Sequence, residues 1–190
     1  MQKSTVYEFL TSTPTINGTK IRLRQRRLRD AINDYYWRKD NELCQLDASK
    51  PVNSSFEEYI HWYANDNSCA GTSYLMAIET LDGKHIGSCG CFNINDTDKE
   101  LELGILIGEK EYWNNGFGFD VIHTLVNELF EHTHSVRIYL KTLDWNLRAH
   151  RCFKKCGFSV CGKTVHDEHS FVVMELKRPG QLSNVLENRD

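Results

Sequence analysis

A glycine-rich segment in the second half of the chain has the residue types of a phosphate-binding loop. The run Trp113-Asn114-Asn115-Gly116-Phe117-Gly118 follows an apolar stretch, Glu100 to Gly108, and opens an amphipathic one that continues to His132. Glycine permits a tight turn and lets the backbone approach a ligand closely. The N-terminus of a following helix adds free N–H groups and a partial positive charge, which together favour a phosphate. An ordinary tight turn is the alternative, because a glycine pair alone is weak evidence.

Other kinds of site fit the sequence less well. A dinucleotide-binding loop needs a further glycine, and Val121 stands at that position. Zinc sites commonly use Cys-x-x-Cys, whereas the pairs here are Cys89-Gly90-Cys91 and Cys152-x-x-x-Cys156. A Cys152 nucleophile with His150 as its base is a poor arrangement, because residues two apart on a helix do not face each other. We therefore expect no metal and no acyl-cysteine intermediate.

The hydrophobic pattern predicts a mixed sheet that would hold the glycine loop. Period-two alternation and short apolar runs predict strands, and apolar residues three or four apart predict helices. Asp82-Gly83 is a strong hairpin signal. A loop through Pro51 separates the first two predicted helices. The expected strands are 20–25, 73–81, 84–93, 100–108, 136–143, 158–164 and 170–176; the expected helices are 27–38, one capped by Ser54 or Ser55, 116–132 and 146–155.

The length and element order predict one domain of α/β (α+β) class. A chain of 190 residues suits a single core. Residues 1–19 are polar and contain Pro14 and Gly18, so we expect an N-terminal arm. The domain would then cover 20–177, with about seven strands and four helices on the faces of the sheet. Residues 178–190 are expected to be a frayed tail.

Charge and composition indicate a cytoplasmic protein with a small-molecule or protein substrate. The net charge of −3 argues against a general nucleic-acid binder. We interpret the basic run between Arg22 and Arg29 as a solvated face, with a patch for an acidic partner or ribosomal RNA as the alternative. Nothing near Met1 resembles a signal peptide, and no apolar run is long enough to span a bilayer. The seven cysteines follow no disulfide framework, so free thiols in a reducing compartment are expected.

Two stretches carry a resemblance to a known family. Glu102-Leu103-Gly104-Ile105-Leu106-Ile107, followed by Trp113-x-x-Gly116-x-Gly118, resembles motif A of the GNAT acetyltransferase superfamily. Asn146-x-Arg148-Ala149-x-x-x-Phe153-x-x-x-Gly157-Phe158 is similar to that family's N-x-R-A-x-x-x-Y-x-K-x-G-F signature. The two motifs lie in the family's order, and the elements agree over about residues 20–177. Tyr112-Trp113 and Ile21-Arg22-Leu23-Arg24 look most like the ribosomal-protein N-terminal acetyltransferase (RimJ/RimL-type) branch, which also includes polyamine-acetylating relatives.

The resemblance implies a GNAT-like, mostly antiparallel twisted sheet and acetyl-coenzyme A (acetyl-CoA) as co-substrate. Ile105, Leu106 and Ile107 would run beside the pantetheine arm, where a backbone N–H would polarise the thioester carbonyl. Asn146 would hydrogen-bond the pantetheine or the acetyl region, and Phe153 takes the place of a common tyrosine. The N–H groups of residues 114–118 would hold the pyrophosphate. Trp113 stands where Gln or Arg is frequent, so it offers the phosphates no hydrogen-bond partner. The cofactor-binding set is thus Ile105, Leu106, Ile107, Trp113, Asn114, Asn115, Gly116, Phe117, Gly118, Asn146 and Phe153.

Amide formation needs a neutral amine, so a base is expected. Glu102 is the predicted base, because the resemblance places a catalytic carboxylate at the head of the strand that leads into motif A. The alternatives are a surface residue paired with Lys99 or Lys110, and Glu100, which shares a strand face with Glu102. The general acid stays open. Phe153 and Ala149 replace the family's usual tyrosine and serine, leaving Cys152, Tyr139, water or unassisted departure of the thiolate.

The main functional hypothesis is transfer of an acetyl group from acetyl-CoA to a protein N-terminal α-amine by direct attack. The alternatives are a polyamine or other small-amine acetyltransferase, a catalytically silent acetyl-CoA-binding module, and a purely structural domain. Acidic residues between the predicted helices would suit a cationic amine, although a solvated face explains them equally: Asp40, Glu42, Asp47, Glu57 and Glu58. A homodimer is considered, while no membrane or nucleic-acid partner is expected.

Overall fold

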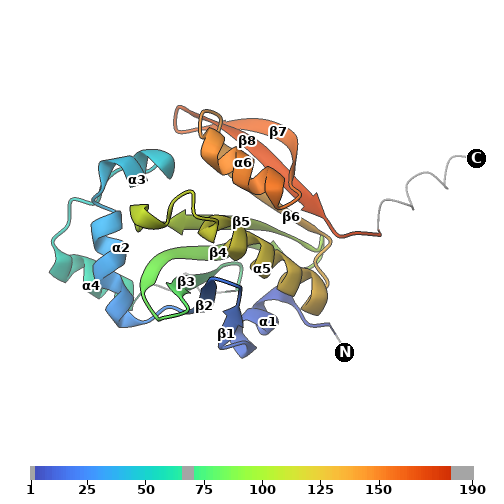
Figure 1. The fold of residues 1–190 in the computed structure, drawn as a ribbon, viewed down its shortest axis with the longest axis horizontal. Helices are drawn as coiled ribbons and strands as arrows, with labels where there is room; N and C mark the ends of the chain where they lie inside the picture. The colour runs from blue at the N-terminus through green and yellow to red at the C-terminus, as the bar shows by residue number, and fades with distance from the viewer. Residues whose placement is uncertain (1–2, 66–70, 181–190) are drawn as a thin grey trace, which may run out of the picture.

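Eight strands form one mixed sheet in the computed structural model, which describes residues 3–65 and 71–180 (Figure 1). The strands are β1 (Thr15–Asn17), β2 (Ile21–Gln25), β3 (Tyr74–Thr80), β4 (His85–Asn95), β5 (Glu100–Ile107), β6 (Arg137–Leu143), β7 (Ser159–His166) and β8 (His169–Lys177). Their spatial order is β1-β2-β3-β4-β5-β6-β8-β7. Neighbours are antiparallel except β5 and β6, which are parallel. The predicted fold class is confirmed.

Six α-helices accompany the sheet within the described ranges. They are α1 (Val6–Ser12), α2 (Ala31–Trp37), α3 (Asn41–Leu46), α4 (Phe56–Ala64), α5 (Phe117–His132) and α6 (Leu147–Lys155). Local sequence explains where several begin. The Ser55 hydroxyl accepts from the Glu58 N–H, and the Glu58 carboxylate accepts from the Ser55 N–H in return. The Asn146 side chain accepts from the Ala149 N–H at 3.2 Å and caps α6. None of these helices is long and apolar enough to cross a membrane.

Two predictions about the elements were wrong. The predicted arm, residues 1–19, is not irregular in its described part, because residues 3–19 contain α1 and β1. Thr5 and Glu8 make a capping box at the start of α1, and the helix buries Val6, Phe9 and Leu10 in the core. The segment before Pro51 is not a simple loop, because it contains α3. The prediction of a frayed tail falls mainly on residues 181–190, which lie outside the described residues.

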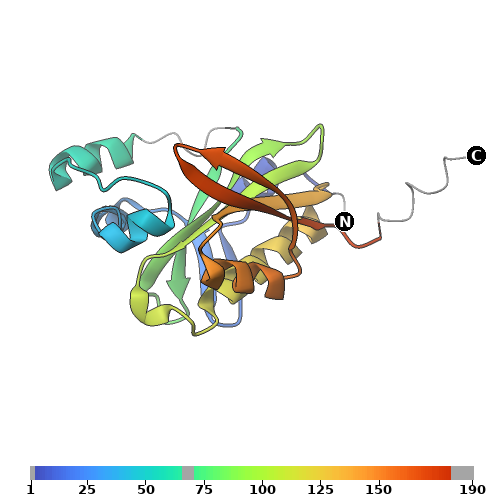
Figure 2. The ribbon, with the colours of Figure 1, turned by 90° about the horizontal axis from the view of Figure 1, so that it is seen from above.

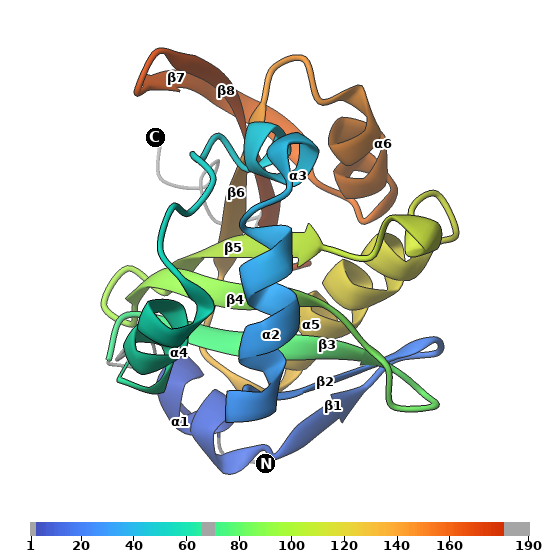
Figure 3. The same ribbon diagram turned by 90° about the vertical axis from the view of Figure 1, so that its left-hand side faces the viewer.

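The helices cover both faces of the sheet. Figure 3 shows α2 crossing in front of β3, β4 and β5, with α5 behind these strands. The view from above in Figure 2 shows α5 and α6 together on one side, consistent with their direct packing. On the other face, α2 and α4 pack through a small cluster of Ala31, Tyr35, Tyr59 and Tyr63. The sheet is therefore covered on both faces, and the glycine loop lies where α5 begins.

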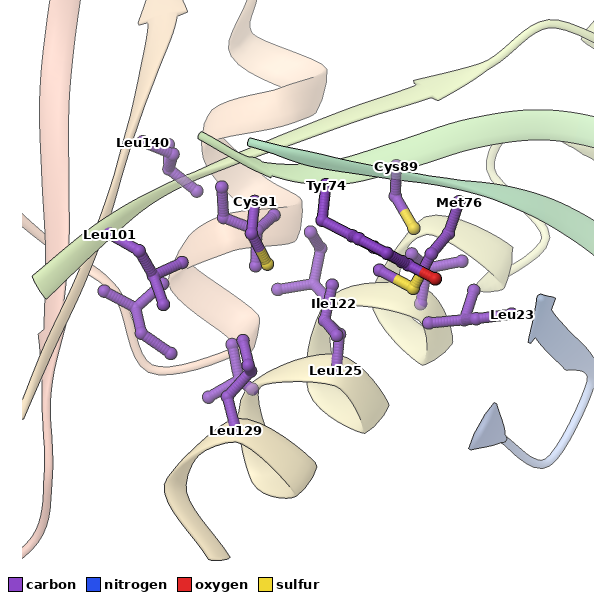
Figure 4. Close-up of a cluster of buried hydrophobic side chains, with 14 of the residues drawn as sticks. Leu23, Tyr74, Met76, Cys89, Cys91, Leu101, Ile122, Leu125, Leu129 and Leu140 are labelled. Atoms are coloured by element: carbon purple, nitrogen blue, oxygen red, sulfur yellow. The ribbon is translucent and has the colours of Figure 1, made fainter. Parts of the chain in front are cut away.

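The main core lies between the sheet and α5. Ile122, Leu125 and Leu129 of α5 are fully buried and point toward the strands in Figure 4. Strand residues that face them include Leu23, Met76, Cys91, Leu101 and Leu140. Cys89 and Cys91 both lie in this core, one pleat apart as their spacing predicts. Burial raises the pKa of the Cys91 thiol to about 12, so this sulfur is a protonated core atom at neutral pH.

The basic run of β2 is largely engaged within the protein. Arg24 is only 3 % exposed and donates to Asp30 at 2.7 and 2.8 Å and to Glu79. Arg26 lies 4.0 Å from the Tyr63 ring centroid. The interpretation of this run as a solvated face is therefore wrong for Arg24. Alternation along β2 alone does not reveal this, because the partners of Arg24 lie outside the strand, at Asp30 and on β3 at Glu79.

Candidate active site

The sheet opens between its two parallel strands. β5 and β6 pair only at Glu100–Glu102 with Arg137–Tyr139. Beyond that point β6 pairs with β8 on its other side, while β5 continues to Ile107. The edge of β5 from residue 103 onward therefore faces an opening. Two cavities lie along it, and both are lined by β5 residues.

The first cavity, which we call the loop cavity, has a volume of about 410 Å³. It is bounded by α3, the end of β5, the glycine loop and α6. Leu43, Leu46 and Ile105 contribute apolar walls, while α6 contributes basic side chains. The lining residues from the glycine loop and α6 are Trp113, Asn114, Gly116, Gly118, Asn146, Arg148, Ala149, Arg151, Cys152, Phe153 and Lys155. This surface combines an apolar channel with a cationic end.

The glycine loop has the backbone shape that its sequence predicts. Asn114 and Gly116 have left-handed φ angles of 60° and 83°, a region that glycine enters without strain. Gly116 is the N-cap of α5, and no side chain caps the helix there. No capping side chain therefore accepts from the first-turn N–H groups. An anion site at a helix N-terminus requires such groups.

Asp120, in the first turn of α5, links the glycine loop to the segment before β2. Its buried carboxylate accepts from the Thr19 hydroxyl at 2.7 Å and from the Lys20 N–H at 2.7 Å. Together with a Thr19 N–H bond, these hydrogen bonds lower the pKa of Asp120 despite its burial. Lys20 is thereby held beside the loop, where its Nζ donates to the Asn115 carbonyl at 2.9 Å. Sequence reasoning missed this link, since residues 19 and 120 are remote along the chain.

Trp113 closes the end of β5. Its indole N–H donates to the Ile107 carbonyl at 2.7 Å, so the ring is fixed and its donor is used internally. The Arg148 guanidinium lies over this ring, 3.7 Å from the centroid. Such a stack orients the guanidinium and leaves its N–H groups for a ligand. Arg148, a residue of the second motif to which no role was assigned from sequence, thus places a cation beside Trp113.

The second cavity, the strand cavity, has a volume of about 530 Å³ and lies between β5, β6 and β7. Its wall carries four ionisable side chains: Asp47, Glu102, Lys141 and His166. The Glu102 carboxylate accepts from Lys141 at 2.9 Å and from Asn93 at 2.8 Å. The predicted alternatives Lys99 and Lys110 are not these partners. Glu100 lies outside both cavity linings and pairs instead with Arg137 at 2.6 Å.

The two cavities meet at a shared wall. It consists of Leu46, Asp47, Ile105, Asn146, Ala149 and Phe153. Asn146 uses its side-chain oxygen to cap α6, which leaves the amide nitrogen as the group it can offer to a ligand. Phe153 is buried and supplies an apolar surface where it meets both cavities. Groups bound in the two cavities would therefore come together beside Ile105.

Most of the predicted residues are brought together. Ile105, Leu106, Ile107, Trp113, Asn114, Gly116, Gly118, Asn146 and Phe153 line the loop cavity, and Glu102 lines the strand cavity. Asn115 and Phe117 are loop residues outside these linings. The Asn115 amide donates to the Glu111 carbonyl, and Phe117 packs edge-on against Tyr112. Arg151 and Lys155 were missed; their spacing from Arg148 on one helix is the signal that could have found them.

The candidate acids differ in their access to the site. Cys152 lines the loop cavity, and a hydrogen bond from Cys156 lowers the pKa of its thiol. Tyr139 lies under the Arg137 guanidinium, 4.7 Å from the ring centroid, and lines neither cavity. Of the two side chains, Cys152 is the one with access to a bound ligand.

Solved structures share this fold. A spermidine N-acetyltransferase from Vibrio cholerae, solved with CoA and spermine, matches with a TM-score of 0.73 and 20% identity over 83% of this chain and 95% of that one. An aminoglycoside acetyltransferase with coenzyme A and kanamycin matches with a TM-score of 0.69 and 21% identity over 83% and 95%. A GNAT-family acetyltransferase from Bacillus anthracis matches with a TM-score of 0.71 and 12% identity over 86% and 98%. At these identities the likeness establishes the fold.

The family assignment comes from the sequence profile. The family described as "Acetyltransferase (GNAT) domain" matches residues 20–159, which include β5, the glycine loop and α6. No curated protein gives a significant sequence match. The profile covers well over half of the chain, and the fold agrees with it. The chain belongs to the GNAT acetyltransferase family.

Proposed function

We propose that this acetyltransferase moves the acetyl group of acetyl-CoA to a primary amine of a small cationic molecule. The observation that carries the proposal is the meeting of the two cavities at the opening between β5 and β6. One cavity has the glycine loop and a basic helix, and the other has carboxylates. Donor and acceptor can thus approach the same point from opposite sides and react directly, with no carrier on the protein.

The loop cavity fits acetyl-CoA in both shape and charge. The N-terminus of α5 offers N–H groups to a pyrophosphate, and Arg148, Arg151 and Lys155 add positive charge. The apolar stretch Ile105–Ile107 suits the pantetheine arm. A free N–H of this open strand edge would polarise the thioester carbonyl. Asn146 would bind the pantetheine or acetyl region, and Phe153 would pack beside it. Two of the similar structures contain coenzyme A, which supports a coenzyme A site in this chain.

The strand cavity, where the acceptor would bind, favours a cation over a neutral peptide surface. Glu102 and Asp47 both border it, and Lys141 is already matched by Glu102. Spermine and kanamycin, the amines in two of the similar structures, are small polycations. These points support the small-amine alternative better than a protein N-terminus. Acetylation of a protein α-amine, and membership of the RimJ/RimL-type branch, stay predictions from sequence.

The proposal is tested by acetylation of a defined panel. Spermidine, kanamycin and a short peptide with a free N-terminus would each be incubated with protein and acetyl-CoA, with products detected by mass because the chain's seven cysteines interfere with thiol reagents. We expect spermidine or kanamycin to gain an acetyl group faster than the peptide. A preference for the peptide would restore the N-terminal α-amine hypothesis. Binding of acetyl-CoA without any product would favour the silent module.

Arg148 should contribute to cofactor affinity. Arg148→Met keeps an apolar side chain against Trp113 and removes the guanidinium, so acetyl-CoA should bind about tenfold more weakly, as expected for loss of one hydrogen bond to a charged group. Isothermal titration calorimetry measures this change. Lys154→Met is the matched control, because Lys154 is exposed on the same helix and lies outside the loop-cavity lining. Equal losses in both variants would argue against a specific role for Arg148.

A further inference from the structure

Asp47 occupies the one position in the site where a carboxylate borders both cavities. Of the six residues in the shared wall of the described structure, Asp47 is the one with an ionisable side chain. Its neighbours in that wall include Leu46, Ile105 and Phe153, which are apolar. Glu102, by contrast, borders the strand cavity alone. Asp47 therefore lies nearer the point where donor and acceptor groups meet.

The local fold holds Asp47 over the opening. It is the C-cap of α3, and its N–H donates to the Leu43 and Cys44 carbonyls. Leu43 and Cys44 are buried and fix the helix. At the other end, Asp40 caps the helix through the Leu43 N–H and pairs with Lys110 at 2.8 Å. Because Lys110 belongs to the segment after β5, α3 is tied to the strand that lines both cavities. A side chain that serves in catalysis needs this kind of fixed support.

The surroundings of Asp47 weaken its preference for the charged form. Asp47 is exposed, and its carboxyl is open to the cavities; the protein atoms around it displace part of its hydration, which raises its pKa. Arg38 and the Ser49 hydroxyl act in the opposite direction. The other titratable or charged groups that line the same cavities are Glu102 of β5, Tyr112 before the glycine loop, Lys141 of β6, His166 of β7, and Arg148, Arg151, Cys152 and Lys155 of α6. A base whose pKa is moved toward neutrality is better matched to proton transfer.

Glu102 is differently placed for the same task. Lys141 and Asn93 both donate to its Oε2, at 2.9 and 2.8 Å. The Glu102 carboxylate is therefore already paired with two donors inside the protein. The pair is well suited to a different role, because its fixed negative charge can bind a second ammonium of a polyamine or an aminoglycoside.

We propose that Asp47 accepts the proton of the attacking amine, while Glu102 orients the remainder of the cationic acceptor. This inference rests on the proposed function and assigns its base. The acceptor enters as an ammonium ion and gives one proton to Asp47. The neutral nitrogen attacks the acetyl carbonyl carbon, the N–C bond forms, and the C–S bond breaks with its electron pair on sulfur. The second nitrogen proton neutralises that sulfur as a thiol, and Asp47 returns its proton to water.

The test compares Asp47→Asn, Asp47→Glu and Glu102→Gln in the full-length protein. Spermidine is the acceptor, or kanamycin where that is the faster substrate of the wild-type protein. We expect Asp47→Asn to lower kcat roughly 100-fold or more, the range for loss of a general base, with acetyl-CoA affinity within about twofold of the wild type. Asp47→Glu should recover part of the rate. Glu102→Gln should act mainly by raising KM.

A pH profile distinguishes a base from a structural residue. In the wild type, Asp47 must be ionised and the acceptor binds as an ammonium ion, so log(kcat/KM) should rise with a slope of about 1 below the pKa of Asp47 and level off above it, up to the pKa of the amine. In Asp47→Asn the acceptor must already be neutral when it binds, so the slope should stay near 1 with no such plateau. Glu102→Gln should keep the plateau.

The outcomes separate the two proposals. An active wild type whose Asp47→Asn variant keeps its rate, or keeps the plateau, would overturn the role of Asp47 and leave the proposed function intact. Loss of acetyl-CoA binding in Asp47→Asn would likewise show a structural role and overturn the inference. Loss of the plateau in Glu102→Gln instead would return the base to Glu102. A wild type that acetylates no amine would remove the proposed function and this inference together.

Discussion

Replacing Gly116 by tryptophan is expected to abolish the stabilisation that acetyl-CoA gives to the folded protein. A ligand at a hundredfold excess over its Kd adds about 2.7 kcal/mol to the free energy of unfolding. Gly116 begins α5 with a left-handed φ of 83° and lines the loop cavity. An indole there would occupy the space in front of the first-turn N–H groups. Thermal unfolding with and without saturating acetyl-CoA measures the difference, which should be close to zero in the variant.

The control for this experiment is Gly83→Trp. Gly83 also has a left-handed φ, 91°, and a Cβ built there meets no atom within 4 Å. It lies in the turn between β3 and β4, so the two variants share the backbone cost of tryptophan in this region. Gly83→Trp should retain the full acetyl-CoA shift although its own melting temperature falls. Equal acetyl-CoA shifts in all three proteins would overturn the assignment of the glycine loop to the cofactor.

The sequence could predict those parts of the fold that depend on local pattern. The Asp82-Gly83 turn, the Ser55 cap and the glycine loop each lie where neighbouring residues alone dictate them. The missed helices α1 and α3 are short, at 7 and 6 residues, so periodicity had little length over which to show itself. The Thr5 and Glu8 capping box was the available signal for α1.

The same distinction between local pattern and tertiary packing applies to the site. The glycine loop and the edge of β5 are contiguous in sequence, so a motif could locate them. Asp47 could be named only as one of several acids, because its place depends on α3 packing over the opening between β5 and β6. The structure separates that group: Asp40 and Glu42 pair with Lys110, while Asp47 faces the cavities. The sequence pattern alone does not show which of several acidic residues the fold brings to the site.

Arg24→Met should lower the free energy of unfolding by about 3–5 kcal/mol, the usual cost of leaving a buried carboxylate without its partner. Asp30 and Glu79 are only 2 and 5 % exposed, and both accept from Arg24. Methionine replaces the volume of the stem but none of the five N–H donors. Urea unfolding at neutral pH measures the loss. Arg22→Met is the control: Arg22 is 37 % exposed on the same strand, and a loss within about 1 kcal/mol is expected.

The pH dependence of the Arg24→Met deficit tests whether charge is its cause. In the wild type the hydrogen bonds from Arg24 help to hold the pKa values of Asp30 and Glu79 below their usual range. Their stabilisation is therefore present above the unfolded pKa values of about 3.9 and 4.3 and lost as the pH falls through the lower folded values. In the variant, loss of the Arg24 guanidinium should raise both folded values, and that of Asp30 most, because Glu79 keeps its bond from Arg22. The variant should then lose stability as the pH rises from about 4 toward 7. The difference in free energy of unfolding between the wild type and the variant should therefore grow over that pH range.

Neutralising the whole cluster should reverse much of the damage. Arg24→Met combined with Asp30→Asn and Glu79→Gln removes the stranded charges together with their partner, and such replacements are often far less costly than breaking a pair. We expect the triple variant to be more stable than Arg24→Met at neutral pH and to lack its pH dependence. A triple variant as unstable as Arg24→Met at every pH would mean that packing of the arginine stem, and not burial of its charge partners, holds β2 to β3.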